Sequence, residues 1–144
     1  MLKRPYSLVA VVVALSACSA GTDPAVTALD GEWSTGHTVI GLEFGISLSW
    51  TRKLVVGGGS YIVFPPSAQC GSIQVSGQGT VALAATRSSS SDVHGHMTLG
   101  NAAPLEYEGT LSNTAQPGFE RVDGFLIGAD GTQCPLTLFH AAIP

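Results

Sequence analysis

Apolar and polar residues alternate with a period of two along most of the chain after Asp30. In the segment IGLEFGISLSWT, residues 40–51, every second residue is apolar, and SIQVS (72–76) and TVALAAT (80–86) repeat the alternation. Successive side chains of a β-strand point to opposite faces, so this pattern predicts strands with one buried face. The spacing of an amphipathic helix, i, i+3, i+4 and i+7, is not found in this part of the sequence.

Clusters of turn-forming residues separate the alternating runs: VGGGS, FPPSAQ, RSSSSD, GNAAP, NTAQPG and GADGT. We therefore expect eight strands, at residues 31–36, 39–51, 54–64, 72–86, 92–99, 104–112, 119–128 and 133–140. Strands that follow one another through short turns favour an all-β fold, an antiparallel up-and-down barrel, which has no exposed sheet edge. A β-sandwich of two sheets needs the same pattern and remains the alternative.

The turn sequence NAAP predicts the pairing of the two strands around it. Placing Leu99 opposite Leu105 pairs Gly95 with Gly109 on the apolar face and puts Glu108 across from His96 on the polar face. The form apolar-x-Gly-x-apolar recurs in VHGHM, YEGTL and VDGFL. Glycine inside a strand marks a bend or a close approach, so these glycines either leave room for a ligand or admit large neighbouring side chains.

The first residues of the chain have the layout of a secretory signal. Two basic residues, Lys3 and Arg4, precede the uncharged run SLVAVVVALSA at 7–17, which is too short for the roughly 20 residues of a membrane-spanning helix. Small residues then lead directly to a cysteine, and Leu15-Ser16-Ala17-Cys18 resembles the lipobox of bacterial lipoproteins. The resemblance implies cleavage before Cys18 and acylation of its thiol.

We accordingly expect a lipoprotein signal peptide at 1–17, a lipidated tether at 18–29 and a barrel domain at 30–144. Two or three acyl chains hold a protein stably on a membrane, so the expected location is the cell envelope, facing the periplasm or the exterior. Because Ser19 rather than Asp follows the cysteine, the resemblance implies the outer membrane in a Gram-negative cell. An ordinary signal peptide that contains a cysteine by chance is the alternative.

Charge restricts the partners of the mature chain. Without Lys3 and Arg4, four basic residues stand against ten acidic ones, a net charge of −6. Such a chain lacks the cationic surface that binds phosphate backbones or anionic lipid, so we expect no nucleic-acid partner and a membrane contact through the acyl chains alone.

Two cysteines remain after Cys18. Cys70 and Cys134 would lie in an oxidising compartment, where a pair of cysteines predicts a disulfide. The alternative, a metal or redox pair, lacks the close spacing of such sites.

Gly31-Glu32-Trp33 resembles the G-x-W that opens lipocalins and avidin-like barrels, where the tryptophan plugs one end. The resemblance implies a barrel shape and no particular ligand. Lipocalins also carry an arginine in the last strand that packs on this tryptophan. Here the last basic residue, Arg121, lies one strand too early, and the T-D-Y motif is absent. If the barrel holds a small apolar ligand, large inward residues would line it: Trp33, Phe44, Trp50 and Tyr107.

His94 and His96 form the most suggestive chemical cluster, since residues i and i+2 of a strand share a face. With Glu108 they could hold zinc or copper and leave one coordination position open; a solvent-facing polar strip is the alternative. His37 and His140 are isolated, and we expect them to be surface or strand-end residues rather than ligands.

Catalysis is not expected, and neither is a cofactor. There is no G-x-S-x-G nucleophile motif. The glycines at 57–59 precede the strand-like SYIVF instead of a helix, so they do not form a phosphate-binding loop. Glu106 and Glu108 share a face that points to water, away from the tuned surroundings of an acid–base pair.

The sequence therefore predicts a membrane-anchored, non-catalytic binding domain with three alternative binding modes. The first is uptake of a small apolar ligand by the barrel. The second is a protein-interaction or inhibitor module on the outer face, for an envelope protein partner. In that case the run GFLIG, residues 124–128, exposes either Phe125 and Ile127 or Leu126. The third is metal binding through His94 and His96.

Overall fold

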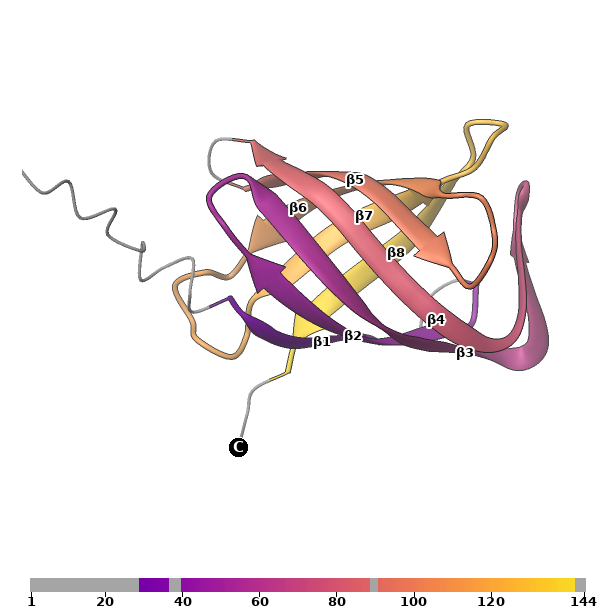
Figure 1. The fold of residues 1–144 in the computed structure, drawn as a ribbon, viewed down its shortest axis with the longest axis horizontal. Helices are drawn as coiled ribbons and strands as arrows, with labels where there is room; N and C mark the ends of the chain where they lie inside the picture. Colours follow the sequence, from indigo (N-terminus) through magenta and orange to yellow (C-terminus); the bar gives the residue numbers. More distant parts are fainter. Residues whose placement is uncertain (1–28, 37–39, 89–90, 142–144) are drawn as a thin grey trace, which may run out of the picture.

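The computed structural model describes residues 29–36, 40–88 and 91–141 and shows a closed barrel of eight antiparallel strands (Figure 1). The strands are β1 (Gly31–Thr35), β2 (Leu42–Trp50), β3 (Leu54–Cys70), β4 (Ile73–Ser88), β5 (Asp92–Leu99), β6 (Leu105–Ser112), β7 (Arg121–Ile127) and β8 (Gln133–His140). Each strand pairs with the next, and β1 pairs with β8, which confirms the up-and-down barrel over the sandwich. The predicted signal peptide, Cys18 and His37 lie outside the described residues.

The alternation in the sequence becomes the two faces of the barrel wall. In β2 the apolar residues from Leu42 to Trp50 are buried while the residues between them are half-buried or exposed. The inward residues of the eight strands join in one hydrophobic core, and Leu29, the last residue of the predicted tether, packs into it. Within the described ranges, no helix is both long and apolar enough to cross a membrane.

Strand β3 is longer than the sequence predicts. FPPSAQ is not a turn, because the strand continues through it to Cys70. Ile62 pairs with Gln78 and Ser67 with Ser76, so the pairing shifts and residues 63–66 bulge opposite Gly77. Proline lacks the N–H that regular pairing uses but is tolerated at a bulge. The turn instead lies at Gly71 and Ser72, where Gly71 adopts a φ of 57° that favours glycine.

The tip of the β3–β4 hairpin extends past the barrel (Figure 1). Cys70 and Cys134 form the predicted disulfide, with Cα atoms 6.1 Å apart. At the tip, Ser72 donates a hydrogen bond of 3.0 Å to Asp130 in the β7–β8 turn. The hairpin is thus held over one end of the barrel by a covalent bond and a polar contact.

The predicted register of β5 and β6 is wrong by two residues. Met97, rather than Leu99, pairs with Leu105, so Glu108 lies across from His94. The reason is the turn. Ala102 donates to the carbonyl of Leu99, and the N–H of Gly100 donates to Thr80 on β4, which keeps the end of β5 with β4 and away from β6. Because the shift is an even number, every side chain keeps its predicted face.

Candidate ligand site at the open end of the barrel

Aromatic side chains close the end of the barrel where the chain enters β1. The indole ring of Trp33 lies 5.4 Å from that of Trp50, and both side chains are at most 3% exposed. The indole N–H of Trp33 donates to the carbonyl of Leu29, 3.1 Å away. Trp33 therefore fills one end of the barrel, as the G-x-W resemblance implies.

A buried histidine–glutamate pair completes this closed end. The imidazole of His140 stacks on Trp33, with ring centroids 4.8 Å apart, and its Nδ1 lies 3.0 Å from Glu120. The carboxylate of Glu120 also accepts the N–H of Gly118 at 2.7 Å. Burial raises the pKa of this carboxyl, but the hydrogen bonds from His140 and the backbone outweigh it and leave the pKa below its ordinary value. The pair therefore packs against Trp33 with little of either side chain in contact with solvent.

Sequence reasoning missed this pair. His140 ends a strand, as expected, but its side chain is only 10% exposed and that of Glu120 3%. One feature could have indicated the pair. His140 ends β8, and β8 pairs with β1, the strand that carries Trp33. His140 thus occupies the place where the lipocalin resemblance expects an arginine.

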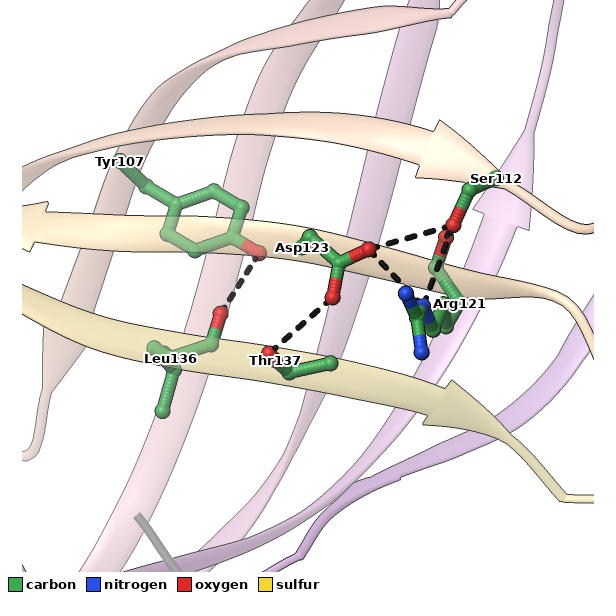
Figure 2. Close-up of polar contacts among 6 residues, drawn as sticks. All are labelled: Tyr107, Ser112, Arg121, Asp123, Leu136 and Thr137. Atoms are coloured by element: carbon green, nitrogen blue, oxygen red, sulfur yellow. Dashed lines mark hydrogen bonds and ion pairs between the residues drawn. The ribbon is translucent and has the colours of Figure 1, made fainter. Parts of the chain in front are cut away.

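The four residues predicted to line a ligand site, Trp33, Phe44, Trp50 and Tyr107, all lie in the core, none more than 3% exposed. Figure 2 shows how Tyr107 reaches from β6 across β7, where its hydroxyl donates to the carbonyl of Leu136 on β8 at 3.3 Å. Gly124 on β7 lies against this side chain, and a Cβ at Gly124 would meet the hydroxyl and ring of Tyr107. Burial is the main cause, and the negative charge of Asp123 the second, that raises the pKa of this phenol far above its ordinary value. The hydroxyl therefore keeps its proton and remains a hydrogen-bond donor.

Most inward glycines of the barrel admit neighbours in the same way. A Cβ at Gly79 would meet the ring of Tyr61, one at Gly95 would meet Ala84 and Ala85, and one at Gly109 would meet Val122. Glycine leaves no space at these positions, because the neighbouring groups occupy it. Gly77 differs, since nothing lies within 4 Å of its Cβ position.

The opposite end of the barrel carries a hollow of about 420 Å³. It lies beneath the β3–β4 hairpin, between that hairpin and the β5–β6 turn. Five apolar side chains line it, together with two alanines of the turn and four uncharged polar residues. The apolar side chains are Tyr61, Ile73, Val75, Leu99 and Leu105, and the polar residues are Ser72, Gln74, Ser76 and Asn101. We call this hollow the open-end site.

The outer face of β1–β3 carries two further hollows, of about 710 and 370 Å³, which meet at Ser34, Gly45 and Ser60. We call them the outer groove. Glu43 lines one hollow and Glu32 the other, whereas no lysine or arginine lines either. Gly45 and Gly58 face outward here, and a Cβ at either would have ordinary contacts, at 4.0 and 3.7 Å.

The predicted metal ligands are partly brought together. One ligand atom each of His94, Glu106 and Glu108 lie within 4.8 Å of one another, on the outer face of β5 and β6. His96 pairs with Glu106 on the same face. In GFLIG, Leu126 is buried, so Phe125 and Ile127 are the outward residues. Phe125 is 41% exposed between Glu108 and Pro135, and Ile127 is half-buried.

Comparison with protein-family models, with curated proteins and with solved structures finds no match to this chain. Function is therefore inferred from the residues of the chain itself.

Proposed function

We propose that this chain is a non-catalytic binding domain, held at the membrane of a bacterial envelope through an acylated Cys18, that takes up a small apolar ligand at its open-end site. The observation that carries the proposal is the hollow, lined by apolar and uncharged polar residues, at one end of a barrel whose other end is closed by aromatic residues. Small-molecule sites are typically hollows of about 300–1,000 Å³, mostly apolar, and the mouths of β-barrels are a common place for them.

The lining supports a neutral ligand with an apolar body and an uncharged polar group. No Asp, Glu, Lys or Arg lines the open-end site, so a charged ligand would lose hydration without gaining a charged partner. Tyr61 and Leu105 are only partly buried and offer apolar contact, beside the buried Ile73, Val75 and Leu99 of the same lining. The amides of Gln74 and Asn101 can hydrogen-bond a hydroxyl or carbonyl group of the ligand.

Binding is favoured over catalysis because Tyr107, Glu120 and Asp130, whose pKa values are shifted, hydrogen-bond to other groups of the chain outside the open-end site. Tyr107 and Glu120 are buried in hydrogen bonds to the chain itself. Asp130, whose pKa the hydrogen bonds from Thr132 and Ser72 lower, serves the β7–β8 turn. None of the three lines the open-end site.

A fluorescent probe and two matched variants test the proposal. N-phenyl-1-naphthylamine is neutral and apolar, and its emission should rise and saturate on binding to the chain. Ser76→Trp places an indole at an exposed residue of the lining of the open-end site and should abolish that rise. Ser47→Trp places the same side chain in the outer groove and should leave binding intact. Equal binding by the wild-type chain and Ser76→Trp would refute the proposal.

The outer groove supports a second candidate, a docking surface for a protein partner of the envelope. Glycine within a strand is unfavourable by about 0.5–1 kcal/mol relative to alanine, yet packing does not require it at Gly45 or Gly58. Glycine at such a position is typical of a site where another chain approaches closely. The carboxylates of Glu32 and Glu43 favour an extended basic segment over a second copy of this chain, which would bring the same charges.

A phage-displayed library of twelve-residue peptides tests this second candidate. Selection on the wild-type chain should enrich peptides rich in Lys and Arg, and these should fail to bind Ser47→Trp while still binding Ser76→Trp. Enriched peptides without basic residues, or peptides that bind both variants equally, would refute it.

A further inference from the structure

We propose that the outer face of β5 and β6 holds a divalent zinc ion, ligated by the imidazole of His94 and the carboxylates of Glu106 and Glu108. This site is separate from the open-end site and the outer groove, and does not depend on either. The carboxylates sit two residues apart on one face of β6, and the pairing of β5 with β6 places His94 directly opposite Glu108.

The spacing of the ligand atoms in the cluster is close to that of a zinc site with its ion bound. At a metal–ligand distance of about 2.1 Å, the ligand atoms of a tetrahedral zinc site lie about 3.4 Å apart. His94 Nδ1 and Glu108 Oε1 are already 3.5 Å apart. The ligand atoms of all three residues lie within 4.8 Å of one another, so small rotations of exposed side chains would bring them onto one ion.

The charge of the cluster also suits a divalent cation. Two carboxylates converge on one imidazole, and a doubly charged ion would neutralise them together. A hollow of about 490 Å³ beside the cluster is lined by His94, His96 and Glu106, with no lysine or arginine among its lining residues. Water or the imidazole of His96 would occupy the fourth coordination position. The corrected register thus replaces the predicted set of His94, His96 and Glu108 by a set in which Glu106 is a ligand and His96 stands beside it.

The imidazole distinguishes this site from an ordinary acidic surface. Ca²⁺ and Mg²⁺ prefer oxygen ligands, whereas imidazole nitrogen favours zinc and its neighbours in the first transition row. Titration calorimetry of the full chain in mild detergent, with Cys18→Ser in every sample to remove its thiol, should give saturable binding of one ZnCl₂ per chain. CaCl₂ at the same concentration should give no such binding.

Matched substitutions locate the ion. His94→Ala and Glu108→Gln should each weaken zinc binding about tenfold or more, since even outer-shell partners of a metal contribute that much. Glu32→Gln, an exposed carboxylate on β1, should leave binding unchanged. In histidine ring NMR spectra, the signals of His94 should shift with zinc while those of buried His140 stay fixed.

Three results would overturn the site. The first is no saturable zinc binding by the full chain. The second is binding that survives His94→Ala. The third is competition by equimolar CaCl₂, which would reveal a general acidic patch instead. The side chains of His94, Glu106 and Glu108 are exposed or half-exposed, so the variants should keep the thermal unfolding temperature of the parent, which is measured alongside.

Discussion

The contact of Tyr107 with Gly124 predicts a measurable coupling between two substitutions. In Gly124→Ala the new methyl group would overlap the Tyr107 hydroxyl and ring. Overpacking of this kind costs about 1–3 kcal/mol, and displacing the hydroxyl from the Leu136 carbonyl would add about 1 kcal/mol. Alanine also reduces the conformational freedom of the unfolded chain, which offsets about 0.4–1 kcal/mol of this loss. We expect a net loss of about 1–3 kcal/mol in the free energy of unfolding.

Removing the hydroxyl should relieve part of that clash. Tyr107→Phe alone should cost about 1 kcal/mol through the lost hydrogen bond. In the double variant the alanine methyl meets a ring without its hydroxyl, so the combined loss should fall below the sum of the single losses by about 1 kcal/mol. Urea unfolding, followed by the fluorescence of the buried Trp33 and Trp50, measures all three. Additivity within about 0.5 kcal/mol would refute the claim that this glycine exists to admit the tyrosine.

Three further predictions concern stability. Cys70→Ser with Cys134→Ser opens a loop of 64 residues and should lower the free energy of unfolding by about 4 kcal/mol; a loss under about 1 kcal/mol in urea would contradict a structural role. Gly59→Ala should destabilise strongly because its Cβ would strike the backbone at Gly45, whereas Gly58→Ala should stay within about 1 kcal/mol of the parent; thermal unfolding of the two variants should rank them in that order. Because the pKa of Glu120 is lowered in the fold, its contribution is present above the ordinary carboxyl pKa of about 4.3 and is lost as pH falls below it. Glu120→Gln should therefore flatten the dependence of stability on pH between about 3 and 5, and an unchanged slope would show that this carboxyl does not titrate differently on folding.

Period-two alternation and turn chemistry were sufficient to predict eight antiparallel strands, but a sandwich fits the same pattern, and the pairing of β1 with β8 decides for the barrel. Each strand keeps one apolar face, and the short turns leave adjacent strands little choice of partner. The errors arose where backbone pairing departs from that pattern. Nothing in FPPSAQ indicates that β4 tolerates a bulge opposite Gly77, and nothing in GNAAP indicates that Gly100 donates to Thr80.

The candidate sites were harder to predict, because each depends on which strands meet in space. The inward aromatic residues suggested a ligand within the barrel, but Tyr107 and Trp33 fill the interior themselves. The open-end site is built from residues of β3, β4 and the β5–β6 turn, and its cover depends on a disulfide across 64 residues. Likewise, a two-residue error in register was enough to put His96 in the predicted ligand set in place of Glu106.

Methyl NMR of the full chain with N-phenyl-1-naphthylamine is the most direct test of ligand uptake at the open end. We predict that the methyl signals of Val75, Leu99 and Leu105, which line the open-end site, shift and saturate with the probe. The methyl signals of Leu54 and Val56, each 45% exposed on the outer face of β3, should stay in place. Shifts confined to Leu54 and Val56, or no saturable shift at Val75, Leu99 and Leu105, would contradict a ligand site at the open end of the barrel.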